Sequence, residues 1–285
     1  MALLKPFAST SKYVFKTIST PSALSPSISR LTATSCRHHS SSATPPRFSP
    51  FGKTSAETEI PYGDIDHASS AYLPHDPREA TSSRSPKDTS IPNDATTSTP
   101  SELTPEQQKL LEEIIRVDQA GEVGANYIYQ GQHAVFKRRR DKRVADIVQN
   151  MWDGEKKHIA TFDKLITQHG IRPTALYPFW KAAGWALGAG TALMGKRAAM
   201  ACTEAIETVI GEHYHSQIKE LERIMPQNHP SMPLLKQILA EFRDDELDHL
   251  DTAIANESQQ TPQYALLSAL IATGCRVAIA TTKKV

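Results

Sequence analysis

The chain has 285 residues, a formal net charge of +1, 39% hydrophobic residues and three cysteines. A charge so close to zero argues against a general affinity for nucleic acid. The cysteines form no Cys-x-x-Cys pair, so neither a zinc knuckle nor a disulfide framework is implied.

The N-terminal part differs in composition from the rest of the chain. No acidic residue precedes Glu57, and basic residues are scattered there among many Ser and Thr. This composition is typical of a mitochondrial presequence, which we predict at residues 1–39; a merely disordered basic tail is the alternative. Residues 40–103 are dominated by Ser, Thr and Pro and predict a disordered, flexible linker. We therefore expect the folded domain at residues 104–282.

The domain opens with signals for a helical hairpin. Thr104 and Pro105 suit the N-cap and first position of a helix. A second helix is expected at about Lys142 to His169, before Gly170. The turn between them, Lys137 to Arg143, holds six cations in seven residues. A solvated helix end is the usual explanation, and contact with anionic lipid is a secondary one.

A second hairpin follows, with helices expected at about 196–224 and 232–257. Between the hairpins, residues 174–195 are apolar with Lys181 as their one charge, and residues 264–280 are similarly apolar. We interpret these two segments as additional membrane-facing helices of a monotopic protein. Aromatic side chains and Lys181 suit a lipid–water boundary, namely Tyr177, Trp180 and Trp185. The alternative is a buried crossover helix and a docked terminal helix.

Each hairpin carries the same arrangement of metal-ligand residue types: a lone Glu on its first helix and Glu-x-x-His on its second. An i,i+3 pair projects from nearly the same side of a helix. Carboxylates can bridge two metal ions, and imidazole completes each coordination sphere. This is the ligand set of an all-α, ferritin-like four-helix bundle with a carboxylate-bridged di-metal centre. The six predicted ligands are Glu122, Glu155, His158, Glu207, Glu246 and His249.

Several polar residues near these ligands are candidates for supporting roles. Asp245 is the first candidate to accept a hydrogen bond from a ligand histidine, and Asp118 is a weaker one. Surface ion pairs with Arg243 or Arg116 are the alternative. The remaining histidines show no metal spacing and are expected at surface or capping positions: His133, His169, His215 and His229.

His213 and Tyr214 are the candidate cofactor-binding residues. Tyr214 lies two turns beyond Glu207, and His213 lies on the flank of the same helix. They could pass protons or electrons to the metals, although simple packing explains them equally well. The sequence has no Gly-x-Gly-x-x-Gly unit, so any contact with NADH as electron donor would be non-standard.

Several longer strings closely resemble one family, the mitochondrial demethoxyubiquinone hydroxylases of ubiquinone biosynthesis. They are Arg116-Val-Asp-Gln-Ala-Gly-Glu122-Val-Gly-Ala125, Met151-Trp-Asp-Gly-Glu155-Lys-Lys-His158, Ala189-Gly-Thr-Ala-Leu-Met-Gly195, Ala199-Met-Ala-Cys-Thr203 and Phe242-Arg-Asp-Asp-Glu-Leu-Asp-His249. The resemblance covers about residues 104–282, and all six predicted ligands match the ligands of the family.

The resemblance implies a di-iron monooxygenase that hydroxylates the ring of a polyprenyl demethoxyubiquinol with dioxygen. It also implies a peripheral position on the matrix side of the mitochondrial inner membrane. There the protein would belong to a ubiquinone-biosynthesis complex that includes a lipid-binding partner protein. Two other functions share the ligand set: a ferritin-like iron-storage or peroxide-scavenging protein, and a non-enzymatic scaffold holding structural metal.

Overall fold

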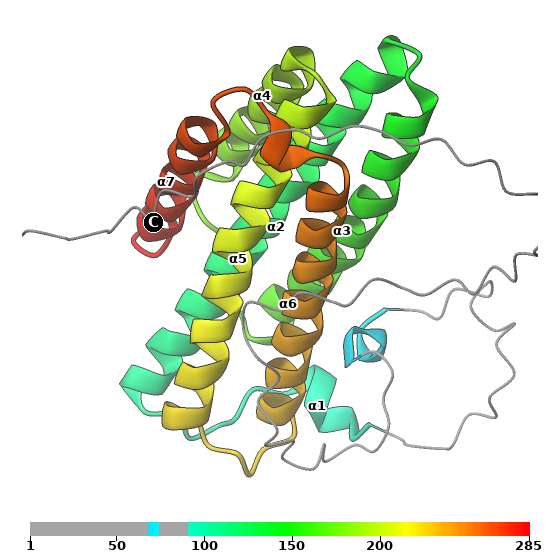
Figure 1. The fold of residues 1–285 in the computed structure, drawn as a ribbon. Helices are drawn as coiled ribbons and strands as arrows, with labels where there is room; N and C mark the ends of the chain where they lie inside the picture. Colours follow the sequence, from blue (N-terminus) through cyan, green and yellow to red (C-terminus); the bar gives the residue numbers. More distant parts are fainter. Residues whose placement is uncertain (1–67, 74–90) are drawn as a thin grey trace, which may run out of the picture. The chain divides into compact units, whose positions relative to one another are not determined.

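The computed structural model describes residues 68–73 and 91–285, and every regular element in this part of the chain is a helix (Figure 1). The prediction of an all-α fold is confirmed. The presequence predicted at 1–39 lies outside the described residues. The long helices are α2 (Pro105–Arg138), α3 (Lys142–Gln168), α4 (Tyr177–Met194), α5 (Lys196–Ile224), α6 (Ser231–Ala255) and α7 (Tyr264–Thr282). The short ones are η1 (Ala68–Ala71), α1 (Asn93–Thr97) and η3 (Ser258–Gln260).

Local signals fix the ends of the first hairpin. The Thr104 hydroxyl accepts from the backbone N–H of Gln107, and the Gln107 side chain accepts in return from the N–H of Thr104. This reciprocal cap satisfies two amide donors that the first helical turn leaves unpaired. At the end of α3, Gly170 adopts φ 60°, a left-handed conformation that glycine reaches without strain.

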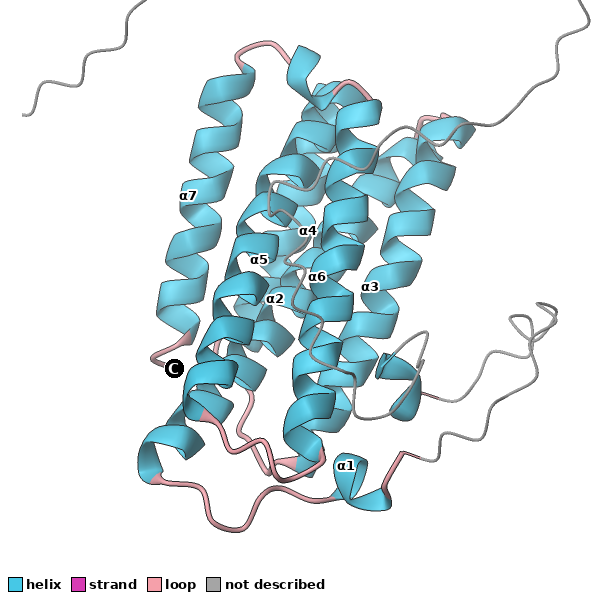
Figure 2. Ribbon diagram, turned by 60° about the horizontal axis from the view of Figure 1, so that its bottom comes forward, coloured by secondary structure: helices cyan, strands magenta, loops and turns pink. Residues whose placement is uncertain are grey.

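Helices α2, α3, α5 and α6 form a four-helix bundle in which α2 packs on α3 and α5 packs on α6 (Figures 1 and 2). One apolar cluster includes residues from the start of α2 and the end of α5, such as Ile114 and Leu221. Another includes residues from the opposite ends of these helices, such as Phe136 and Met200. Both clusters exclude water. The predicted ligands therefore lie along the helices between two dry layers.

Helix α4 crosses α2 so closely that the contact tolerates only glycine at several points. A Cβ built on Gly188 would lie 2.0 Å from the carbonyl oxygen of Ile128, and one on Gly184 would lie 2.6 Å from that of Gly124. Small residues four positions apart let two helix backbones approach in this way. Elsewhere α4 is exposed and carries large apolar side chains, among them Phe179 and Trp185. Helix α4 is thus a packed crossover helix that also presents an apolar outer surface.

Helix α7 packs on α5 and α2 but buries little of itself. Leu266 and Leu270 are 66% and 70% exposed. Among the described helices, only α7 is long and apolar enough to cross a membrane, and a single helix of this kind is weak evidence for a span. Its start is held by Glu204 of α5, which accepts from the Tyr264 hydroxyl at 2.6 Å.

Two pieces of the predicted linker pack on the bundle, which differs from the flexible segment expected at 40–103. Ala68 and Ala95 are buried in the apolar cluster at the starts of α2 and α6. The Ser69 hydroxyl donates to Glu241 at 2.6 Å, and Tyr72 donates to Gln168. Small apolar residues and side-chain hydrogen bonds anchor these two pieces, although the Ser/Thr/Pro-rich composition predicted no ordered contact with the bundle.

Candidate metal centre

Six side chains from the middle of the four bundle helices converge in the interior. They form two overlapping groups that could each hold a metal ion, Glu122, Glu155, His158 and Glu246 in one and Glu155, Glu207, Glu246 and His249 in the other. Within each group, the potential ligand atoms lie within 4.8 Å of one another. Glu155 and Glu246 belong to both groups. The arrangement is that of two metal sites bridged by two carboxylates.

The two histidines face the shared carboxylates from opposite sides. His158 Nδ1 lies 3.1 Å from a Glu246 oxygen and 3.4 Å from a Glu122 oxygen. His249 Nδ1 lies 3.1 Å from a Glu155 oxygen and 3.2 Å from the second Glu246 oxygen. Each histidine therefore serves one group, and the bridging carboxylates lie between them.

Most carboxylate oxygens of the cluster are buried without a hydrogen bond, which fits a centre that binds cations. All four carboxylates are almost fully buried. Each has at least one oxygen that finds no hydrogen-bond partner within the described part of the chain, and both oxygens of Glu155 are in this condition. Burying unpaired carboxylates is strongly unfavourable. Two divalent cations remove this penalty, and mixed carboxylate and imidazole ligands suit iron or manganese.

Electrostatics within the cluster follow from burial and mutual repulsion. Burial, reinforced by the charge of Glu246, raises the pKa of Glu155 to about 8. The same causes hold the pKa of Glu207 well above its ordinary value. Burial opposes the charged form of His158, but contacts with Asp245, Glu122 and Glu246 outweigh it and raise its pKa. The cluster strongly favours added positive charge.

Residues around the ligands set the orientation of both histidines. His158 Nε2 lies 3.1 Å from an Asp245 oxygen, which confirms Asp245 as its acceptor. The His158 ring stacks on Phe242 at a centroid distance of 3.9 Å. On the other side, a Cβ built on Gly154 would lie 3.2 Å from His249 Nε2. The absence of a side chain at Gly154 makes room for His249.

Two tyrosines hold the lone carboxylates in a crossed arrangement. Tyr129 of α2 donates to Glu207 of α5 at 2.6 Å, and Tyr214 of α5 donates to Glu122 of α2. Each tyrosine lies seven residues after the lone Glu of its own helix. Sequence reasoning selected Tyr214 as a candidate cofactor contact but missed Tyr129, although the repeated spacing of seven residues was visible.

Asp118 and His213 lie near each other and do not contact the ligand histidines. The buried Asp118 carboxylate accepts from Gln217 Nε2 at 2.8 Å and lies 3.7 Å from His213 Nε2. Asp118 is thus no acceptor for a ligand histidine. The alternative ion pairs are absent too, since among the described residues Arg116 pairs with Glu112 and Arg243 with Asp244.

His213 lines a surface groove of about 400 Å³ between α2 and α5. Tyr214, the next residue, points inward to Glu122. The two candidate cofactor-binding residues therefore face in different directions, His213 towards the surface and Tyr214 towards the metal ligands. Two of the other histidines occupy capping positions, with His169 at the end of α3 and His229 at the start of α6.

Comparison with known proteins agrees with this site. The family model described as ubiquinone biosynthesis protein COQ7 matches residues 109–282. The chain is 47% identical to the NADPH-dependent 3-demethoxyubiquinone 3-hydroxylase, mitochondrial, of Mus musculus over 169 residues, 59% of this chain and 75% of the relative. It is 44% identical to the 5-demethoxyubiquinone hydroxylase, mitochondrial, of Saccharomyces cerevisiae over 64% of this chain and 82% of the relative.

A bacterial relative shows the same similarity. The 3-demethoxyubiquinol 3-hydroxylase of Rhodospirillum rubrum is 44% identical over 181 residues, 64% of this chain and 81% of the relative. All six predicted ligands lie within the residues that the family model matches. The chain therefore belongs to the COQ7 family of ubiquinone biosynthesis proteins.

Proposed function

We propose that this chain is a di-iron monooxygenase that hydroxylates the ring of demethoxyubiquinol with dioxygen in ubiquinone biosynthesis. The observation that carries the proposal is the pair of ligand groups sharing Glu155 and Glu246. Glu122, His158, Glu207 and His249 complete them. Iron bound there would supply the redox chemistry that activates dioxygen, for which protein side chains alone have no equivalent.

The residues of the chain contribute position, charge and exclusion of water. Asp245 orients the His158 ring, and the crossed tyrosines, Tyr129 and Tyr214, hold the lone carboxylates in place. The dry layers on either side of the cluster limit side reactions with water. These features prepare the ligands before the metal arrives.

The apolar outer surfaces of α4 and α7 are proposed to receive the substrate from a membrane. Exposed apolar patches of this kind mark interaction with lipid or another apolar partner. The polyprenyl tail of the quinol would lie along these helices and supply binding energy remote from the ring. Association with the membrane would be peripheral, and α7 would lie against the surface rather than span it.

Electrons are proposed to enter on the side of His213 and Tyr214. His213 lines the groove between α2 and α5, and Tyr214 contacts the ligand Glu122. The mouse relative is named NADPH-dependent, and a reduced nicotinamide, NADH or NADPH, is the donor we propose. The groove is lined by both acidic and basic residues, and Lys283 pairs with Glu113 at 2.8 Å. We propose that the nicotinamide end of the donor lies near His213.

The proposed location is the matrix side of the mitochondrial inner membrane, since the mouse and yeast relatives are both named mitochondrial. The basic segment at 1–39 would direct the chain there and be removed, and the domain at 104–282 would carry the activity. Partners would be the other proteins of a ubiquinone-biosynthesis complex, including a lipid-binding protein.

Anaerobic reconstitution with ferrous ion, followed by quinol substrate and oxygen, tests the proposed activity. The expected result is two iron ions per chain and a product with one added oxygen atom. Glu155→Ala should abolish turnover and lower the iron content. Asp153→Asn, an exposed position on the same helix whose carboxylate pairs with Lys156, should leave both unchanged. Retained turnover in Glu155→Ala would refute the proposal.

The same reconstitution also tests the storage alternative. A storage or scavenging protein would take up many iron ions per chain and leave the quinol unmodified. A scaffold would bind metal without any product and would retain its partners in Glu155→Ala.

A further inference from the structure

The turn between α2 and α3 concentrates positive charge, most of which makes no contact within the fold. Residues 137–143 hold six cations and one acid, Asp141, and residues 137 to 143 are all exposed. Asp141 accepts from the backbone N–H of Val144 as the cap of α3. Of the six cationic side chains, Arg139 alone forms hydrogen bonds to the described part of the chain, and the other five project into solvent without an ion pair there.

Local structure accounts for only two of these five cations. Lys137 and Arg138 suit the negative end of the α2 dipole, but Lys142 and Arg143 begin α3, where cations are disfavoured. Arg140 has φ 60°, a left-handed conformation that favours glycine or asparagine. Like charges so close together also repel one another. Arg140, Lys142 and Arg143 therefore occupy positions where the backbone or the helix end favours other residues.

Arg139 ties this basic turn to the end of α4. Its guanidinium donates to the carbonyl oxygens of Ala192 at 3.0 Å and Leu193 at 2.9 Å, in the last turn of the helix. The side chains of Leu193 and Met194 are 61% and 66% exposed. Unpaired cations and protruding apolar side chains therefore lie next to each other on the surface.

We propose that the basic turn, residues 137–143, binds the phosphate headgroups of anionic lipids while Leu193 and Met194 enter the lipid interface. The proposal rests on the membrane association proposed above and adds a preference for negatively charged lipid. A bilayer surface satisfies both halves of the patch at once. Nucleic acid or an acidic protein would satisfy the cations and leave the apolar side chains in water.

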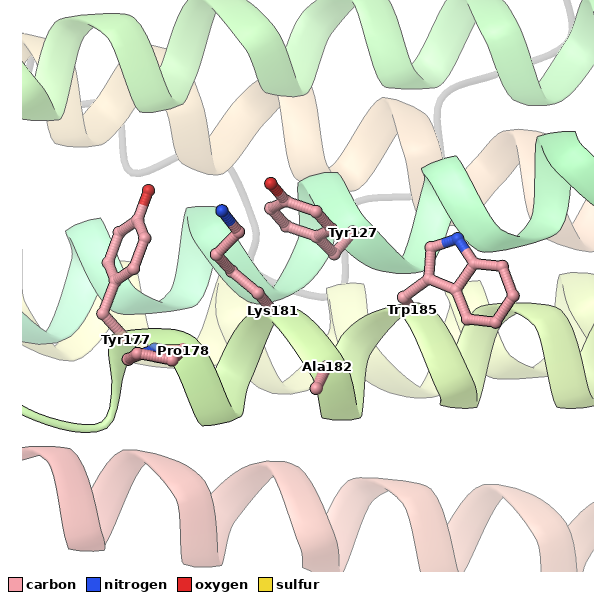
Figure 3. Close-up of a pocket in the computed structure, with 6 residues that line it drawn as sticks. All are labelled: Tyr127, Tyr177, Pro178, Lys181, Ala182 and Trp185. Atoms are coloured by element: carbon pink, nitrogen blue, oxygen red, sulfur yellow. The ribbon is translucent and has the colours of Figure 1, made fainter.

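The other end of α4 carries a similar combination, which sets the orientation of the helix. Lys181 lies between the rings of Tyr127 and Tyr177, at 5.0 and 5.5 Å from their centroids (Figure 3). With Trp185 they line a shallow surface groove of about 500 Å³. Twelve residues separate Lys181 from Leu193, about 18 Å along a helix. A cation between aromatic rings at one end of α4, and the basic turn beside Leu193 and Met194 at the other, would together anchor the helix along the membrane surface.

Chemical footprinting of the full chain tests the contact locally. Lys137 and Lys142 should lose reactivity towards an acetylating reagent when phosphatidylglycerol-containing vesicles are added. They should keep it with vesicles of phosphatidylcholine alone. Lys164 and Lys219, exposed elsewhere on the bundle, serve as internal controls and should react equally in all conditions. Unchanged labelling of Lys137 and Lys142 on anionic vesicles would overturn the proposal.

A charge variant gives the second test. Each cation near an anionic surface contributes about fivefold to binding, so the triple variant Lys137→Gln, Arg138→Gln and Arg140→Gln should weaken binding to anionic vesicles by about 100-fold. The control triple Lys164→Gln, Arg172→Gln and Lys219→Gln removes the same charge elsewhere and should change binding only slightly. Equal losses in both triples, or a loss of heparin binding without a loss of vesicle binding, would contradict the proposal. Both variants should retain hydroxylation of detergent-solubilised quinol, and inactivity of the unmodified chain would count against the proposed function instead.

Discussion

Replacing Gly188 by alanine should destabilise the protein, because α4 crosses α2 with no space for a side chain there. The added Cβ would lie 2.0 Å from the carbonyl oxygen of Ile128 and 2.8 Å from its Cα. An ordinary contact begins at 3.4 Å, so the two backbones would have to separate by about 1.4 Å. No side-chain rotation can relieve the clash, since the obstructing atoms belong to the backbone.

The expected loss follows from two opposing effects. Overpacking costs about 1–3 kcal/mol or more, and alanine recovers about 1 kcal/mol in helix propensity. Since the obstruction is rigid, we expect the upper part of the range and a net loss of about 2 kcal/mol. In a domain of this size that lowers the Tm by about 4–8 °C.

Gly190→Ala is the matched control, two residues further along the same helix. A Cβ there meets no atom within 4 Å, so the variant should gain up to about 1 kcal/mol from helix propensity alone. Thermal and denaturant unfolding, followed by circular dichroism, compares the two variants. If Gly188→Ala proves as stable as Gly190→Ala, the close crossing of α4 on α2 is wrong.

Three further predictions concern the interior of the bundle. Tyr129→Phe removes the hydrogen bond to Glu207 and should weaken iron affinity by about 10–100-fold with little change in fold; competition with a coloured chelator measures this, and unchanged affinity would show that Tyr129 only packs. Stripping the metal with a chelator should lower the Tm, because the buried carboxylates then repel one another, and an unchanged Tm would contradict the fit of cations to this cluster. Burial, aided by the charge of His229, lowers the pKa of His169 to about 4. Between about pH 6.5 and pH 4, His169 therefore binds a proton in the unfolded chain but not in the folded one. As the pH falls through this range, the free energy of unfolding should decrease by at most about 3 kcal/mol. In the His169→Gln variant this part of the decrease should be missing when the free energy of unfolding is measured by denaturant titration at several pH values.

The sequence predicted the fold well where one helix face or one helix end carried the signal. The third long helix was expected at 196–224, and α5 spans Lys196–Ile224. Thr104 caps α2 as its position before Pro105 and Gln107 indicated. The shared helix face of each Glu-x-x-His pair was also predictable, because i,i+3 spacing fixes it, and the structure brings both pairs together with Glu122 and Glu207.

Contacts between helices could not be predicted in the same way. The position of Asp118 in the sequence did not show that its hydrogen-bond donor would be Gln217, which lies on another helix. The ordered pieces at 68–73 and 91–103 escaped prediction because single residues such as Ser69 and Tyr72 anchor them, within a composition that is otherwise typical of disorder. The close approach of α4 to α2 depends on glycines whose role appears only when both backbones are in place.

The crossed contacts explain why the site needs both hairpins at once. Each ligand group draws on both halves of the chain, since α6 supplies Glu246 to the group of Glu122 and α3 supplies Glu155 to the group of Glu207. The tyrosine hydrogen bonds also connect the two halves, one donated from α2 to α5 and the other from α5 to α2. A single hairpin therefore offers an incomplete set of ligands and an incomplete set of hydrogen-bond donors. Metal binding must stabilise the docking of the two halves, and any change that loosens their packing should release metal before either hairpin loses its helices.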